Sequence, residues 1–273
     1  MENFDFNQAL PSGVSSMLSA GGILLLSAVI VMVVVIMKRW KGRIMPGILG
    51  VVAYCIFVFI FTNLATSALA LVPGVDNVFY NNPATYNIVY AIIASVGFTI
   101  TRIITGYMLK DRFERKGDVY IAGIGISMGD SLLYGLTAIS YITWCAAINS
   151  GDISSLIADF TTQEAATTLE TVTSLFTSPP VLWLLLGISC ILDMIINIAL
   201  FNMVFGAVKD NVSKWWYGIT AGIQFFSMIS FLLYDSESLA SILICFAVKL
   251  IIFAATVYYT FKTAGKEIEY SDD

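Results

Sequence analysis

Long apolar runs alternate with short polar segments along the whole chain. Each run is close to the roughly 20 residues that one helix needs to cross the hydrocarbon core of a bilayer. The runs predict seven membrane-spanning helices, at residues 18–37, 46–72, 87–109, 119–148, 181–208, 215–234 and 239–261. We therefore expect an all-α integral membrane fold, a seven-transmembrane-helix bundle that forms a single polytopic membrane domain over residues 1–273.

The basic residues predict the orientation of this bundle. Twelve of the 14 Lys and Arg residues fall in four of the segments between or after the runs, at 38–43, 110–116, 209–214 and 262–266. Because cytoplasmic loops carry an excess of Lys and Arg, the N-terminus is expected outside and the C-terminus inside. We thus expect a multi-pass protein of the plasma membrane of a bacterial cell, with the lipid bilayer as its first partner.

One extramembrane segment, residues 149–179, is longer than the others and carries no Lys or Arg. Its apolar residues Ile153, Leu156, Ile157 and Phe160 recur at the spacing of an amphipathic helix. The pattern predicts short amphipathic helices that lie over the outer mouth of the bundle. The alternative is a docking surface for an external partner.

Composition excludes several classes of function. Only 12% of the residues are charged and 58% are hydrophobic, whereas soluble domains carry about 25% charged residues. A nucleic-acid partner is not expected, because such a protein needs a basic stripe. Histidine is absent, which excludes Ser-His and Cys-His catalytic pairs and any metal site with an imidazole ligand. We expect no metal and no cofactor.

Two glycine pairs predict close contacts between helices. Gly125 and Gly129, and Gly218 and Gly222, have the spacing that lets membrane helices approach one another. Both pairs are therefore expected where two helices cross.

Four charged residues lie within the predicted spans, where an ionised side chain is costly and is normally paired. They are Arg102, Asp130, Asp193 and Lys249. With a rise of about 1.5 Å per residue, Arg102 and Asp130 lie about 12 and 17 Å from the cytoplasmic end, and Asp193 and Lys249 about 18 and 15 Å from the outer end. These matched depths predict two ion pairs, Arg102 with Asp130 and Asp193 with Lys249.

Further polar side chains surround these charges at helical spacing, and they complete a predicted intramembrane polar network. Ser189, Asp193 and Asn197 are four residues apart, Thr99 lies one turn from Arg102, and Gln224 is the main amide of its span. Such a network either holds the helices together through hydrogen bonds or lines a functional cavity. The residues alone leave both alternatives open.

The stretch from Gly97 to Ile153 resembles the YhfC-like family of glutamic or metal-dependent intramembrane peptidases, which is related to PrsW and the wider CAAX-protease group. The matching residues are Arg102 before the basic loop, Gly123 and Gly125, the acidic Asp130, and the string at 147–151. The seven-helix plan also matches, so the resemblance covers most of the chain.

The chain departs from the family at the positions that carry chemistry. Thr99 stands where the family has the Glu of its ExxR element, and Ile126 and Asp130 stand where its glycine motif has a His and a Glu. The family's Glu-Arg pair is replaced by Ser189-Cys190, and its later His by Gln224 or Gly222. Each change removes a metal ligand, a general base or a residue that orients one. The resemblance thus implies a degenerate member with no catalytic residue, a pseudo-peptidase.

We interpret the chain as a non-enzymatic protein that binds or scaffolds a membrane-protein or peptide partner, in an immunity, secretion or transporter-accessory role. The first alternative is an active intramembrane peptidase that uses the two carboxylates Asp130 and Asp193. A second is a transporter or channel subunit with a buried charge network. A third, a retinal protein with Lys249 in its seventh helix, lacks a carboxylate counter-ion in the third span.

Overall fold

The protein is described by a computed structural model that covers residues 10–151, 172–232, 235–262 and 264–270. This part of the chain is helical, with no strand. The helices are α1 (Val14–Trp40), α2 (Ile44–Tyr54), the π-helical η1 (Cys55–Ile60), α3 (Phe61–Ala70), α4 (Val75–Asn81), α5 (Pro83–Leu109), α6 (Lys116–Ser150), α9 (Val181–Val208), α10 (Trp216–Leu232), α11 (Leu239–Lys262) and the 3₁₀ turn η2 (Ala264–Glu267). The expected all-α membrane fold is confirmed.

Six helical stretches in the described residues are long and apolar enough to cross a membrane. They are 14–40, 44–70, 83–109, 116–150, 181–208 and 239–267, and they correspond to six of the seven predicted spans. The remaining predicted span, 215–234, corresponds to α10, which has 17 residues. The count of seven spans and the orientation of the termini stay predictions. Of the segment 149–179, in which short helices were expected, residues 152–171 lie outside the described residues and 172–177 are helical.

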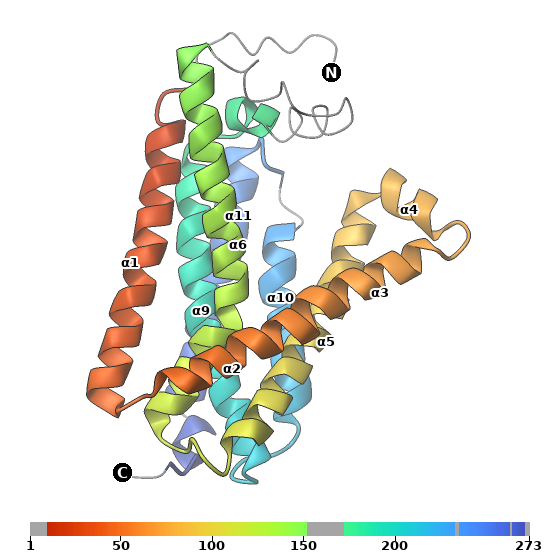
Figure 1. Ribbon diagram of the computed structural model, residues 1–273. Coiled ribbons are helices and arrows are strands. Elements are labelled where there is room, and N and C mark those ends of the chain that lie inside the picture. The colour runs from red at the N-terminus through yellow and green to blue at the C-terminus, as the bar shows by residue number, and fades with distance from the viewer. Residues whose placement is uncertain (1–9, 152–171, 233–234, 263, 271–273) are drawn as a thin grey trace.

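The second stretch is not one uniform helix, although a single span was predicted there. The π-helical turn η1 joins α2 to α3, and Figure 1 shows this segment running obliquely across the other helices. Such π turns are rare and occur mostly as single turns inside α-helices. Here α5 approaches it closely at Gly97, where a Cβ atom would lie 2.4 Å from the Phe57 carbonyl oxygen.

Glycines also set the approach of α6 to α2. A Cβ at Gly125 would lie 2.1 Å from the Gly47 carbonyl oxygen, and a Cβ at Gly129 would lie 1.8 Å from the Tyr54 ring. The predicted close contact is confirmed for this pair. It is wrong for Gly218 and Gly222, because a Cβ atom at either position would have no heavy atom of the described chain within 4 Å.

The basic segments between the helices gather at one end of the bundle, at the bottom of Figure 1. There Asp118, in the first turn of α6, accepts hydrogen bonds from the Arg43 backbone N–H at 2.8 Å and from its Nε at 3.1 Å. The hydrogen bond between the two side chains raises the pKa of Arg43 above its usual value. The arrangement fixes the start of α2 against the start of α6.

The C-terminal segment folds back onto the same end. Ile268 is buried in the core cluster that contains Phe205 and Val212, and the Tyr270 hydroxyl donates a hydrogen bond to Asn202 on α9. Lys209 at the end of α9 forms an ion pair of 2.5 Å with Glu114. These contacts attach the C-terminal segment and the loop between α5 and α6 to the end of α9.

Candidate functional site

Arg102 is the largest fully buried side chain described in the structure. It projects from α5, and its Nη2 donates hydrogen bonds to Asn197 Oδ1 on α9 and to Gln224 Oε1 on α10. Its guanidinium also lies 5.3 Å from the centre of the Phe98 ring. The helical spacing predicted Arg102, Asn197 and Gln224 in one network, and the structure brings all three together.

Two donor atoms of this guanidinium, Nε and Nη1, have no hydrogen-bond partner among the described residues. No carboxylate in the described chain forms an ion pair with Arg102. Arg102 is therefore held by neutral amides, which satisfy only part of its donor capacity.

The predicted ion pair between Arg102 and Asp130 is wrong. Asp130 instead accepts a hydrogen bond from the hydroxyl of Tyr54 on α2. The rings of Tyr54 and Phe98, whose centres are 5.7 Å apart, form one aromatic contact, and Arg102 packs on the Phe98 side of it. Matching depths along two helices give the heights of the two charges but not the directions in which they point.

Tyr54 is a site residue that the sequence pattern did not mark. It is 3% exposed and packs on Gly129, directly before Asp130. It lies in an apolar run without polar periodicity, so the only available signal was the glycine spacing on the partner helix.

Asp193 and Lys249 form an intramembrane ion pair, as their depths predict. Lys249 Nζ on α11 lies 2.5 Å from Asp193 Oδ1 on α9, and the lysine side chain is 2% exposed. Ser227 on α10 completes the contact: its hydroxyl donates to Asp193 Oδ1 at 3.0 Å, and its carbonyl oxygen accepts from Lys249 at 3.2 Å. Three helices thus meet at this pair.

The two groups of residues belong to one cluster. Asn197 Nδ2 donates a hydrogen bond of 3.0 Å to the Asp193 carbonyl oxygen, which links the arginine site to the ion pair. Asp130 lies near enough to interact electrostatically with both Asp193 and Lys249. We call the set Tyr54, Arg102, Asp130, Asp193, Asn197, Gln224, Ser227 and Lys249 the polar cluster.

The structure does not join the other two predicted residues to the polar cluster. The Thr99 hydroxyl donates to the Ser95 carbonyl oxygen of its own helix at 2.9 Å. Ser189 is buried one turn before Asp193, and no described side-chain hydrogen bond connects it to the cluster.

Accessibility separates Asp130 from the rest of the polar cluster. Its side chain is exposed, while Arg102 and Lys249 are buried. The exposed residues Leu133, Thr137 and Ser140 continue the same face of α6. Asp130 is therefore the charged group of the cluster that a second molecule reaches most easily.

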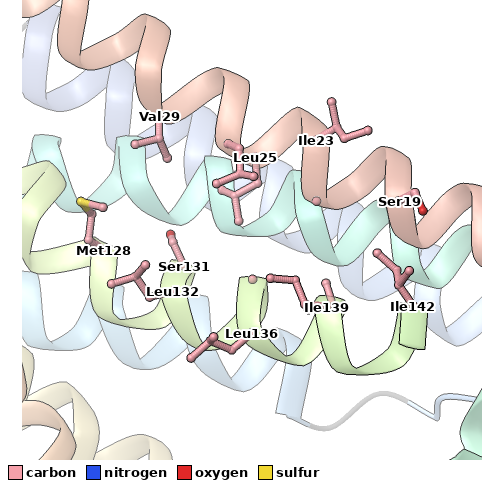
Figure 2. A pocket seen from close by; sticks show the side chains of 14 residues that line it. Ser19, Ile23, Leu25, Val29, Met128, Ser131, Leu132, Leu136, Ile139 and Ile142 are labelled. Atoms are coloured by element: carbon pink, nitrogen blue, oxygen red, sulfur yellow. The ribbon is translucent and has the colours of Figure 1, made fainter. Parts of the chain in front are cut away.

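A separate hollow lies between α1 and α6. Figure 2 shows this groove of about 390 Å³, which is lined by apolar side chains, by Ser19 and Ser131, and by Gly22 and Gly135. No ionisable side chain of the described chain lines it. The groove is mainly apolar, and the hydroxyls of Ser19 and Ser131 are its polar side-chain groups.

A family model for YhfC intramembrane metalloproteases matches residues 23–251. The chain belongs to this family. The match spans the helices that carry the whole polar cluster. No curated protein and no solved structure matches the chain.

The described residues of this YhfC family member do not fit a catalytic metal. A protein zinc site uses three or four ligands, mostly His, Cys, Asp or Glu. The chain has no His, and no group of three such residues that could hold a metal exists in the described part of it. The carboxylates of Asp130 and Asp193 already bind Tyr54 and Lys249. The donor set therefore disagrees with the chemistry that the family description implies.

Proposed function

We propose that this chain keeps the membrane scaffold of the YhfC family, has lost peptide hydrolysis, and acts as a pseudo-peptidase that binds or scaffolds a membrane protein or peptide. The observation that carries the proposal is the use of the intramembrane carboxylates: Asp130 accepts from Tyr54, and Asp193 is paired with Lys249. Together with the absence of His, this leaves no ligand set for a metal-bound water among the described residues and no general base beside one.

A second candidate, an active peptidase with Asp130 and Asp193, has one observation in its favour. The two carboxylates interact electrostatically, and two acids that share a proton suit aspartyl catalysis. Against it, Lys249 supplies Asp193 with its own counter-charge at 2.5 Å. Asp193 therefore has no need to share a proton with Asp130.

Comparing the protein N-termini of membrane fractions tests for hydrolysis without knowledge of a substrate. Cells that carry the wild-type chain, the Asp130→Asn/Asp193→Asn double variant or no chain are compared by mass spectrometry. We expect no N-terminus that depends on the chain. New N-termini that disappear in the double variant would establish the peptidase and contradict the proposal.

Purification in a mild detergent tests the binding role. The proposal predicts a stoichiometric membrane partner that stays with the chain, whereas recovery of the chain alone in high yield would count against it.

For location, we propose the plasma membrane of a bacterial cell, with the N-terminus outside. The gathering of the basic segments at one end of the bundle supports this orientation. Reporter fusions at the C-terminus test it, because they should be active only inside.

A further inference from the structure

Among the described residues, no cation is in direct contact with Asp130, a charged residue within the α6 span. Its one hydrogen-bond partner there is the neutral hydroxyl of Tyr54, and no basic side chain among the described residues forms an ion pair with it. Asp193, in contrast, has Lys249. Arg102, the other charged residue of the polar cluster without an ion pair in the described chain, is wholly buried, whereas Asp130 is exposed. An isolated carboxylate within a bilayer is unfavourable, so the arrangement favours binding of a cation.

The protein also holds this carboxylate in a fixed position. The Tyr54 ring packs against the backbone of Gly129, so closely that a Cβ there would lie 1.8 Å from the ring. The Tyr54 hydroxyl binds Asp130 Oδ1, and no described hydrogen bond uses Oδ2. One carboxylate oxygen is anchored, and the other is available to a second donor.

The surface around Asp130 is an exposed face of α6. Leu133, Thr137 and Ser140 follow Asp130 on one exposed face of α6. Figure 1 shows α3, α4 and the first half of α5 leaning away from α6 beyond the point where α2 crosses it. A membrane-spanning helix satisfies its own backbone hydrogen bonds, so it can lie along this face without exposing polar backbone to lipid.

The depth of Asp130 in the membrane and the ligands available near it indicate which kind of cation can bind. Asp130 is about 21 Å from Lys116, the first residue of α6, at about 1.5 Å per residue, which places it beyond the reach of lipid headgroups at that end. A metal ion needs several ligands, and no group of three acidic, His or Cys residues is available in the described chain. A Lys or Arg side chain carries its charge on a long apolar stem, which suits the site.

We propose that the Asp130 face of α6 binds a transmembrane helix that carries a Lys or Arg near the middle of the bilayer. This inference rests on the proposed binding function and specifies the class of partner. Charge complementarity with Asp130 gives selectivity, and the exposed residues of α6 provide the contact surface. An amide or a carboxylate at the same position of the partner would bind less well, because the amide cannot neutralise Asp130 and the carboxylate repels it.

Designed peptides test the proposal without knowledge of the natural partner. Three labelled Leu/Ala transmembrane peptides that differ only in a central Lys, Gln or Glu are reconstituted in lipid nanodiscs with the labelled protein. Association is measured by energy transfer. The wild-type chain should bind the Lys peptide at least about tenfold more tightly than the Gln peptide, a difference of about 1.4 kcal/mol.

Variants of Asp130 show whether this residue causes the preference for the Lys peptide. Asp130→Asn should bind the Lys and Gln peptides equally, Asp130→Glu should keep the preference for Lys, and Asp130→Lys should prefer the Glu peptide. Asp76→Asn removes an equal charge at an exposed position of α4 and should behave as the wild type. Thermal unfolding and gel filtration of each variant verify that it is folded before association is measured.

Equal binding of the three peptides to the wild-type chain, no binding of any, or a Lys preference that survives in Asp130→Asn would overturn the inference. These outcomes are distinct from failure of the proposed function. A cleavage product in the N-terminal comparison would end the pseudo-peptidase proposal whatever the peptides do, while absent selectivity would leave that comparison unchanged.

Discussion

Lys249 Nζ lies 2.5 Å from Asp193 Oδ1, and the pair joins α11 to α9 within the membrane. Removing one partner of a buried pair leaves an uncompensated charge, whereas removing both leaves none. Lys249→Met and Asp193→Asn should each lower the free energy of unfolding by about 3 kcal/mol. The double variant should recover most of this loss.

Unfolding of these variants in mixed detergent measures the coupling between Asp193 and Lys249. The exchanged variant, Asp193→Lys/Lys249→Asp, should be more stable than either single charge reversal. If the effects of the single substitutions add in the double variant, the two residues are not energetically coupled and the described contact does not stabilise the fold.

Tyr54 positions Asp130 through its hydroxyl and through the packing of its ring on Gly129. Substitutions can separate the hydrogen bond from the packing. Tyr54→Phe removes the hydroxyl that binds Asp130 but keeps the ring on Gly129, so it should cost about 1 kcal/mol. Gly129→Ala should cost more, because its Cβ would lie 1.8 Å from the ring. Gly135→Ala is the matched control, since nothing in the described chain lies within 4 Å of its Cβ position. Thermal unfolding in detergent should rank Gly129→Ala as the least stable, and equal stability of the two alanine variants would contradict the packing described.

The amides around Arg102 should matter more than the hydroxyl one turn away. Asn197→Leu or Gln224→Leu removes an acceptor from a wholly buried guanidinium and should cost about 1.5 to 3 kcal/mol. Thr99→Val should cost about 0.5 kcal/mol or less, because the Thr99 hydroxyl bonds to its own helix. The free energies of unfolding of the three variants check this order. A Thr99→Val variant as unstable as Asn197→Leu would show that Thr99 belongs to the polar cluster.

At the end of the bundle where the basic segments gather, the Asp118 carboxylate accepts from both the backbone and the side chain of Arg43. Asp118→Asn should therefore destabilise the chain by about 2 kcal/mol, since hydrogen bonds to a charged group are lost. Asp111→Asn, at an exposed position of the preceding loop, should have an effect within about 0.5 kcal/mol. Thermal unfolding of the two variants at low and high salt distinguishes this buried contact from general surface charge, because only the latter is strongly screened.

The helical fold could be predicted from the sequence because charge-free runs of this length have few alternatives in a bilayer. The Asp193–Lys249 contact could also be predicted, since two opposite charges at one depth each need a partner. The π turn at Cys55–Ile60 could not, because it lies within an uninterrupted apolar run, and its close contact with α5 at Gly97 is not visible in the sequence.

The contacts of Asp130 and Arg102 show the limit of reasoning from depth. Height along a helix follows from counting residues, but the direction of a side chain depends on which neighbours the helix packs against. Arg102 donates hydrogen bonds to Asn197 on α9 and Gln224 on α10, and Tyr54 on α2 donates one to Asp130. Tyr54 lies in an apolar run, so no charge or polar spacing marked it.

The donor set around Asp130 and Asp193 does not fit a catalytic metal among the described residues of this YhfC family member. The proposed pseudo-peptidase is therefore expected to hold none. The zinc content of the purified protein tests this conclusion, and it is measured by mass spectrometry after expression and purification in the presence of zinc. We expect far less than one bound zinc ion per chain, with the same value for Asp130→Asn and Asp193→Asn. About one zinc ion per chain in the wild type, lost in either variant, would contradict the conclusion.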